Sequence, residues 1–183
     1  MKKSNIWIFA LIAIALVAIL APSLRDFFKD QVDMKATVDR VEDSTNFSDQ
    51  EYNVELRGMN VPDANLKDFR DKTLFLNFWG TWCPPCREEW PTIQKLYDQK
   101  KGNMNFVLIA MQDKEDAVKK FLEENHYNVP VYIASSPLPD RFLVTIFPTT
   151  FVVDPSGKIL KKEEGTLDWS SPEVLKFLEG HLK

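Results

Sequence analysis

The strongest constraint on the fold is a pair of cysteines placed directly after a buried strand. Residues 73–79 (TLFLNFW) are apolar, β-branched or aromatic except for Asn77, a pattern typical of a strand covered on both faces. The segment WCPPC follows at 82–86 and is predicted to begin a helix, because proline is favourable in a first helical turn. Two cysteines at this spacing can close a small disulfide ring, and the positive end of the helix dipole favours a thiolate on Cys83. The pattern therefore indicates thiol–disulfide exchange.

The composition of the chain limits the functions that this cysteine pair can have. Cys83 and Cys86 are the only cysteines among the 183 residues, so no structural disulfide framework is available. The formal net charge is −4, and a mildly acidic chain is a poor match for nucleic acid, whose binding needs clustered Lys and Arg. We therefore predict no nucleic-acid partner.

The N-terminus has the pattern of a membrane signal anchor. Lys2 and Lys3 precede an uncharged run over residues 6–21, and no A-x-A cleavage pattern follows. An uncleaved anchor over residues 1–23 is favoured over a cleaved signal peptide. The two lysines are expected to stay in the cytoplasm, which places the rest of the chain on the periplasmic side of a bacterial cell envelope. The polar residues 24–51 are predicted to be a juxtamembrane segment and linker.

Residues 52–183 are predicted to form one α/β domain with a mixed sheet. Apolar runs and turn signals alternate strands with helices before a final hairpin and helix. The expected strands cover residues 52–57, 73–79, 105–111, 129–134, 149–154 and 158–163, and the expected helices follow Cys86, Lys114 and Ser171, with a short helix or loop at 135–144.

Two segments in this order resemble the thioredoxin superfamily, and within it the membrane-anchored TlpA/ResA-like thiol-disulfide oxidoreductases. They are LNFWGTWCPPCREEWP at 76–91 and FPTTFVVDPSGKI at 147–159, with the predicted anchor in front. The resemblance covers about residues 52–183 and implies a thioredoxin-like fold. Thioredoxins themselves are shorter between these two segments. An insertion between the CxxC helix and the strand after Pro148 is therefore implied.

The resemblance also implies roles for the residues around the pair. Cys83 would be the nucleophile and Cys86 the more buried, resolving thiol of a redox-active disulfide. Pro148 matches the family's cis-proline, so the peptide bond from Phe147 would lie against the sulfurs and pair with substrate backbone. Trp82 is expected to shield the disulfide and to line the face on which a substrate docks.

The proton carrier is indicated by a departure from the thioredoxin pattern. Thioredoxins carry a buried Asp on the central strand where this chain has Asn77, which cannot titrate. Glu89, about one helical turn past Cys86, matches the active-site glutamate of the ResA-like branch and could move protons for Cys86. The alternative is that Glu89 is a solvated carboxylate beside Glu88.

The two residues between the cysteines predict the direction of electron flow. Neither Pro84 nor Pro85 has an N–H that could stabilise a thiolate at the helix start. A less stabilised thiolate corresponds to a less oxidising disulfide, so we expect a protein-disulfide reductase. The family further implies clients with disulfides, among them apocytochrome c, and a membrane thiol-reductant as electron donor. No cofactor is predicted.

Two other functions stay open at the level of sequence. A Cu(I)-binding metallochaperone could use the CxxC as a soft site, although two thiolates without a third ligand would not make a closed zinc site. A disulfide oxidase or isomerase is also compatible with the motif, because partners help to set the direction of electron flow.

Overall fold

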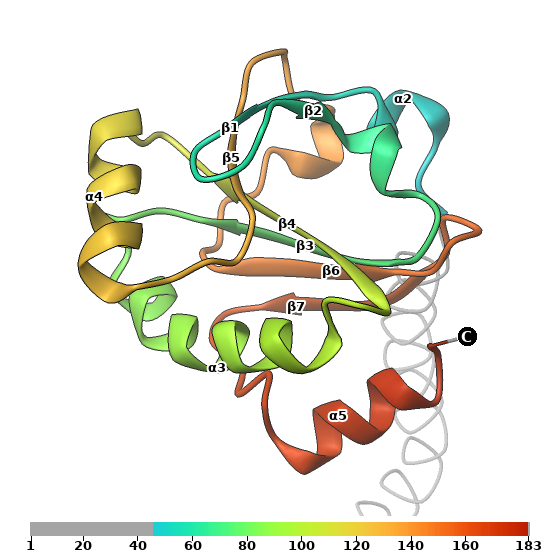
Figure 1. The fold of residues 1–183 in the computed structure, drawn as a ribbon. Helices are drawn as coiled ribbons and strands as arrows, with labels where there is room; N and C mark the ends of the chain where they lie inside the picture. Colours follow the sequence, from blue (N-terminus) through green and yellow to red (C-terminus); the bar gives the residue numbers. More distant parts are fainter. Residues whose placement is uncertain (1–45, 183) are drawn as a thin grey trace, which may run out of the picture. The chain divides into compact units, whose positions relative to one another are not determined.

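Residues 46–182 form a mixed α/β domain in the computed structural model of the chain, which describes these residues only. A seven-stranded sheet in the order β2-β1-β5-β4-β3-β6-β7 runs through the domain (Figure 1). The predicted anchor over residues 1–23 lies outside the described residues. None of the helices within residues 46–182 is long and apolar enough to cross a membrane. In chain order the elements are α2 (Asp49–Tyr52), β1 (Glu55–Gly58), β2 (Ala64–Asn65), η1 (Leu66–Phe69), β3 (Thr73–Trp79), α3 (Pro84–Lys100), β4 (Met104–Ala110), α4 (Glu115–Asn125), β5 (Val131–Ala134), η2 (Asp140–Phe142), β6 (Thr149–Val153), β7 (Ile159–Glu164) and α5 (Pro172–Glu179).

Strand β3 is central to the sheet and has the bounds predicted from its apolar pattern. It pairs in parallel with β4, from Thr73 opposite Met104 to Trp79 opposite Ala110, and antiparallel with β6 on its other edge. All seven of its residues are buried. A strand with both edges paired and both faces covered must be apolar throughout, which explains its sequence.

Alternation along β3 divides the core into two layers. Phe75 and Trp79 pack with residues of α3, α4 and α5, whereas Leu74, Leu76 and Phe78 pack in a second cluster with residues of α2 and η2. Figure 1 shows α3 and α5 on one side of the sheet and α2 on the other. Since successive side chains of a strand point to opposite faces, Asn77 lies on the face covered by α3.

The start of the domain differs from the prediction, which assigned residues up to Glu51 to the linker. Phe47 is only 4% exposed, and its N–H donates to the Gly157 carbonyl at 2.7 Å. Ser48 and Glu51 form a capping box at the start of α2, and Glu51 also forms an ion pair with Arg141. The linker assignment is therefore wrong for residues 47–51, because Phe47 and Glu51 have partners far away in the sequence. The strand predicted over 52–57 is correspondingly shorter and begins at Glu55.

The implied insertion between α3 and the Pro148 strand is present as β5 and η2. Strand β5 pairs in parallel with β4 and antiparallel with β1, so it adds to the sheet rather than extending a loop. It begins at Val131 and not at Val129 as predicted. Pro130 accounts for the difference, because it has no N–H to donate to a neighbouring strand.

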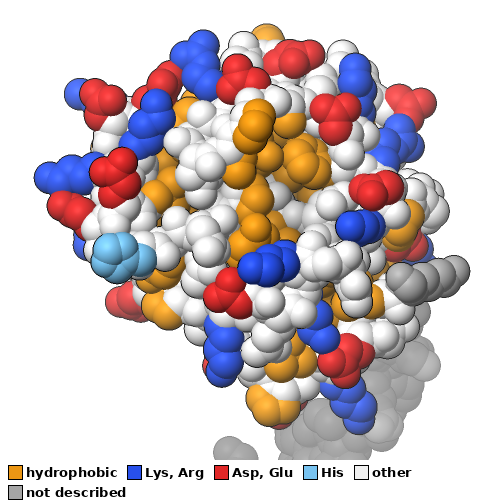
Figure 2. All heavy atoms as spheres, in the orientation of Figure 1, with side chains coloured by type: hydrophobic (Ala, Val, Ile, Leu, Met, Phe, Trp, Pro, Cys, Tyr) orange, Lys and Arg blue, Asp and Glu red, His pale blue; other side chains and the backbone are white. Residues whose placement is uncertain are grey.

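The surface in Figure 2 mixes charges of both signs. Hydrophobic side chains gather in a band across the middle of this face, with Lys, Arg, Asp and Glu interspersed around it. The net charge of −4 is therefore not collected into a single acidic patch on the face shown.

Candidate active site

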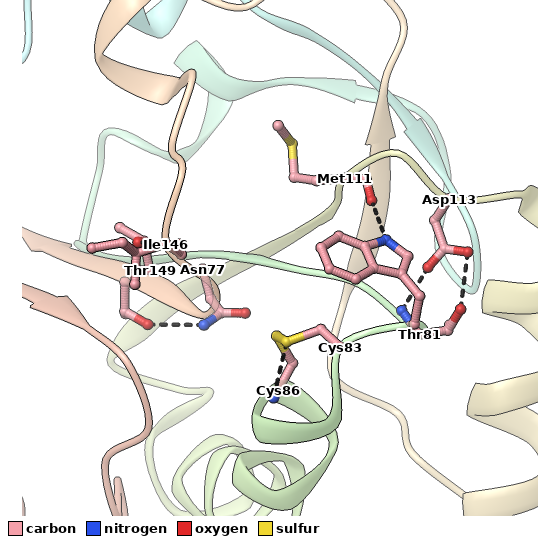
Figure 3. The surroundings of a disulfide bond; sticks show 10 residues. Asn77, Thr81, Cys83, Cys86, Met111, Asp113, Ile146 and Thr149 are labelled. Carbon is pink, nitrogen blue, oxygen red and sulfur yellow. Dashed lines mark hydrogen bonds between the residues drawn. A yellow bond between two sulfur atoms is a disulfide. The ribbon is translucent and has the colours of Figure 1, made fainter.

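The two cysteines close the predicted disulfide in the first turn of α3. The chain turns after β3 through Gly80, whose carbonyl accepts the Cys83 N–H at 3.1 Å. The Cα atoms of Cys83 and Cys86 are 5.3 Å apart and their sulfurs are bonded (Figure 3). Cys83 is the N-cap residue of α3, and its sulfur accepts the Cys86 N–H at 3.2 Å. Because Pro84 and Pro85 lack an N–H, Cys86 supplies the first backbone donor of this helix.

The difference in exposure between the two sulfur-bearing residues is much smaller than predicted. Cys83 is 3% exposed and Cys86 is 1% exposed, whereas the resemblance implied a nucleophile that is clearly less buried than Cys86. Both residues belong to the buried cluster between the sheet and α3, because the strand–helix junction packs directly onto that core. In the disulfide form a partner must therefore reach a nearly covered sulfur.

Trp82 lies beside the disulfide and is fixed in place by a hydrogen bond. Its indole N–H donates to the Met111 carbonyl at 2.9 Å, its ring centroid is 5.2 Å from that of Phe147, and the residue is 49% exposed. A Cβ at Gly80 would lie 2.5 Å from the Trp82 indole nitrogen, so glycine permits the close approach of the ring. The Phe147–Pro148 peptide bond is cis, as the resemblance implied.

A loop after β4 holds the turn in front of Cys83, and the sequence interpretation missed it. Asp113 accepts the Thr81 N–H at 2.6 Å and the Thr81 hydroxyl at 2.9 Å (Figure 3). The Met111 N–H donates to the Trp79 carbonyl at 2.7 Å. Asp113 is 32 residues from Thr81, so no local pattern connects them. The available signal was that β3 and β4 were both predicted strands, and the loops after neighbouring parallel strands meet at one edge of a sheet.

Glu89 is a buried carboxyl, which rules out the solvated alternative. The residue is 1% exposed, and its Oε1 accepts the Leu167 N–H at 3.1 Å and the Trp169 indole N–H at 2.6 Å. Its Oε2 has no hydrogen-bond partner. Burial raises the pKa of Glu89 to about 7, although the two N–H donors and the Asn77 amide favour the ionised form. The site therefore contains a carboxyl that titrates near neutral pH, about one helical turn past Cys86.

Asn77 lies on the same face of the sheet and supplies no charge. It is fully buried, and its amide nitrogen donates to the Thr150 hydroxyl at 2.8 Å. Its amide oxygen has no partner, and Figure 3 shows that oxygen on the side of the disulfide. The titratable group near the pair thus comes from α3 through Glu89 and not from the central strand.

Metal binding at this place would depend on the two sulfurs alone. When reduced, Cys83 and Cys86 could hold a soft cation such as Cu(I) between two thiolates. Within residues 46–182 no group of three or more His, Cys, Asp or Glu side chains is arranged to bind a metal ion.

A mixed sheet whose central strand leads into a helix with CxxC in its first turn, together with a cis-proline before β6, defines the thioredoxin-like class of proteins. The chain belongs to the Redoxin family, which matches residues 47–178. Within the thioredoxin superfamily it is a TlpA/ResA-like protein.

Individual relatives support this placement. Thiol-disulfide oxidoreductase ResA from Bacillus subtilis is 34% identical over 117 residues, which cover 63% of this chain and 65% of that protein. The aligned part is therefore less than two thirds of the length of this relative. The protein of the same name from Halalkalibacterium halodurans is 26% identical over 97% of this chain and 96% of its own length. A thiol:disulfide interchange protein of the thioredoxin family from Chlorobium tepidum has a similar fold, with a TM-score of 0.59, 23% identity, and coverage of 75% of this chain and 100% of that chain.

Proposed function

We propose that the chain is an exported, membrane-tethered thiol–disulfide oxidoreductase that reduces the disulfides of client proteins through Cys83 and Cys86. One observation carries the proposal: the disulfide in the first turn of α3 is followed one turn later by the buried carboxyl of Glu89, whose pKa is about 7. Thiol–disulfide exchange needs a base to activate one thiol and an acid to protonate a departing thiolate. A carboxyl that titrates near neutral pH can serve as both.

Reduction of a client would proceed in two exchange steps. The Cys83 thiolate attacks one sulfur of the client disulfide, which forms a mixed disulfide and releases a client thiolate. The Glu89 carboxylate then takes the proton of the Cys86 thiol, and the Cys86 thiolate attacks the Cys83 sulfur. This second attack closes the internal disulfide, releases the second client thiolate and leaves Glu89 protonated. Two electrons thus pass to the client, and the electron donor restores the dithiol by the reverse sequence.

The backbone around Cys83 supports the reducing direction. A helix start normally offers several N–H groups to a thiolate, and each stabilises the charged form. Here Pro84 and Pro85 have none, and the Cys86 N–H is the donor that meets the Cys83 sulfur. A Cys83 thiolate with few donors favours a low reduction potential, nearer to the value of about −270 mV for thioredoxin than to about −120 mV for a strong oxidant.

Three exposed hydrophobic side chains support docking of a protein client. Among residues 46–182 the large exposed hydrophobic residues are Trp82, Leu143 and Ile146, which are 49%, 58% and 48% exposed. Trp82 contacts Phe147, the residue before the cis-proline, and Ile146 directly precedes Phe147. An apolar surface next to the disulfide suits an unfolded or extended client segment better than a small polar substrate.

The anchor predicted from the sequence would place this chemistry outside the cytoplasm. In that setting a membrane thiol-reductant would supply electrons, and apocytochrome c, whose cysteines must be reduced before haem attachment, is the client that the ResA-like resemblance implies. Both partners are part of the proposal, and the trapping experiment below can identify the client.

The test is to trap the mixed disulfide. Cys86→Ser should retain the attacking thiol and lose the resolving one, so client proteins should accumulate on Cys83 as covalent adducts that a reducing agent releases. Cys83→Ser is the matched control and should trap nothing. A redox titration of the purified chain should give a potential close to that of thioredoxin. Adducts that form on Cys86 instead, or a potential close to the oxidising limit, would contradict the proposal.

A further inference from the structure

The loop between β7 and α5 contributes two donors to the proposed proton carrier. The main-chain N–H of Leu167 and the indole N–H of Trp169 both point to Oε1 of Glu89, at 3.1 Å and 2.6 Å. Trp169 is 80 residues away from Glu89 in the sequence. These contacts therefore arise from the tertiary structure alone.

Trp169 is held in place by packing and by hydrogen bonds to α3. It is fully buried, and its ring packs edge-on against Phe75 of β3 with centroids 4.8 Å apart. Its main-chain N–H donates to the Thr92 hydroxyl at 3.3 Å, and that hydroxyl donates to the main-chain carbonyl of Glu89 at 2.8 Å. The loop is thus tied to α3 through both the side chain and the main chain of Glu89.

The two oxygens of Glu89 are in unequal environments. Oε1 accepts two hydrogen bonds, whereas Oε2 is buried without any partner. A protonated carboxyl keeps its proton on the oxygen that accepts fewer hydrogen bonds, because an oxygen facing two N–H donors cannot also carry a hydrogen toward them. Burying an oxygen without a hydrogen-bond partner also costs more free energy when the oxygen is charged than when it carries a proton.

We propose that Trp169 is a positioning residue that fixes Oε1 of Glu89 and so makes Oε2 the atom that exchanges its proton with Cys86. This inference rests on the proposed function, because it assigns the atom through which the carboxyl works. When an incoming thiolate opens the disulfide, Cys86 leaves as a thiolate, and the proton on Oε2 passes to it. When Cys86 must attack, its proton returns to Oε2, so that no proton is gained or lost overall.

Other groups around Glu89 do not replace this role of Trp169. Glu163 of β7 is the charged side chain that acts on the carboxyl through space, and it raises the pKa of Glu89. Asp168, in the same loop, is turned toward Ser170, whose N–H and hydroxyl it accepts at 2.9 Å and 2.8 Å. The amide of the neighbouring Asn77 lowers the pKa of Glu89, but it carries no charge, and its nitrogen donates to the Thr150 hydroxyl while Oε2 of Glu89 has no partner. The two cysteines do not titrate while they form the disulfide.

The test compares two tryptophan-to-phenylalanine variants of the disulfide form. Trp169→Phe retains a ring that can pack on Phe75 and removes the N–H donor. Trp90→Phe is the matched control, because Trp90 is also fully buried but its indole nitrogen has no hydrogen-bond partner. Protonation of Glu89 is followed by the infrared carboxylic-acid band, which is assigned by its absence in Glu89→Gln.

We expect the midpoint of this titration near pH 7 in the parent protein and about one unit higher in Trp169→Phe, since a hydrogen bond to the ionised form is lost. Trp90→Phe should leave the midpoint unchanged. An unchanged midpoint in Trp169→Phe, or an equal shift in both variants, would overturn the proposal.

A second measurement needs no change at Trp169. The indole ¹H–¹⁵N resonance of Trp169 in the parent protein should shift as Glu89 titrates and should not shift in Glu89→Gln, while the Trp90 resonance stays constant. A Trp169 resonance that does not change with pH would overturn the assignment of Trp169 as a positioning residue. Neither readout requires client reduction, so the two proposals can fail separately. If only the proposed function were wrong, no clients would be trapped, but Glu89 would still titrate as described.

Discussion

Glu89 lies in an environment far from that of its isolated side chain in water. A carboxyl that is 1% exposed and has one unpartnered oxygen binds its proton more tightly than a solvated carboxyl does. The same burial that costs stability in the charged state brings the pKa to about 7, where a proton can be both taken and released at neutral pH. At the scale of single residues, the proposed proton transfer therefore depends on desolvation of one side chain.

The pH dependence of stability should report this directly. The pKa of Glu89 rises from 4.5 in the unfolded chain to about 7 in the folded one, so its proton stabilises the folded disulfide form fully below pH 4.5. That contribution should be lost as the pH rises through about 7, and the shift corresponds to roughly 3 kcal/mol of unfolding free energy. Urea unfolding of the parent and of Glu89→Gln over a pH series should show this slope in the parent and its loss in the variant.

Glu88→Gln serves as the control for that measurement, because Glu88 is the adjacent exposed carboxylate. It should retain the slope of the parent. We also expect Glu89→Gln to slow disulfide reduction and to flatten its pH profile. Equal slopes and equal rates in the parent and in Glu89→Gln would contradict the role given to this carboxyl.

At the scale of secondary-structure elements, the site is assembled from the ends of strands and the start of one helix. Strand β3 delivers the turn at Gly80 to the first residue of α3, and the loop after β4 holds that turn through Asp113. The loop after β7 reaches Glu89. Each of these three segments follows a strand, whereas the cis-proline segment precedes β6. This is expected where the sheet supplies rigidity and the loops carry the functional residues.

The short segment before β1 gives a prediction at this scale. Phe47 packs its ring against Tyr52, Phe142 and Phe151 at centroid distances of 5.6, 5.2 and 5.6 Å. Phe47→Ala should therefore lower the unfolding free energy by about 3–5 kcal/mol, the usual cost of removing a buried phenyl ring. Gln50→Ala, an exposed change three residues away, should cost less than about 0.5 kcal/mol in the same urea titration. Equal stability of the two variants would show that residues 47–51 behave as the linker the sequence suggested.

At the scale of the whole molecule, the domain over residues 46–182 offers its disulfide beside an apolar surface, and the preceding residues carry the pattern of an anchor. Lys2, Lys3 and the uncharged run over 6–21 predict that the domain is held outside the cytoplasm at a membrane. Tethering would restrict the proposed reductant to partners at the same surface.

Topology can be tested with the full chain. Alkaline phosphatase fused after Lys183 should be active in bacterial cells, because it folds correctly only outside the cytoplasm, and the fusion should stay in the membrane fraction after carbonate washing. A fusion that lacks residues 1–23 should lose the phosphatase activity. Recovery of a soluble, shortened protein that begins near Pro22 would instead indicate a cleaved signal peptide.

The sequence by itself determined the features that depend on local pattern. The bounds of β3 and of the helix at Glu115, the placement of CxxC in a first helical turn and the proline at the start of β6 follow from side-chain periodicity and from the restrictions on proline. The carboxyl one turn past Cys86 could be placed for the same reason, since helical spacing is a property of the backbone.

Only the tertiary structure decided which of these residues are buried and what they contact. The sequence could not distinguish a solvated Glu89 from a buried one, because its burial comes from Leu167 and Trp169 on a loop more than 75 residues away. The same origin explains why Cys83 is nearly buried and why Asp113 accepts hydrogen bonds from Thr81. It also explains why Phe47 is part of the core. Each depends on a contact between segments far apart in the chain, and desolvation, which sets the pKa of the carboxyl, exists only once those segments have packed.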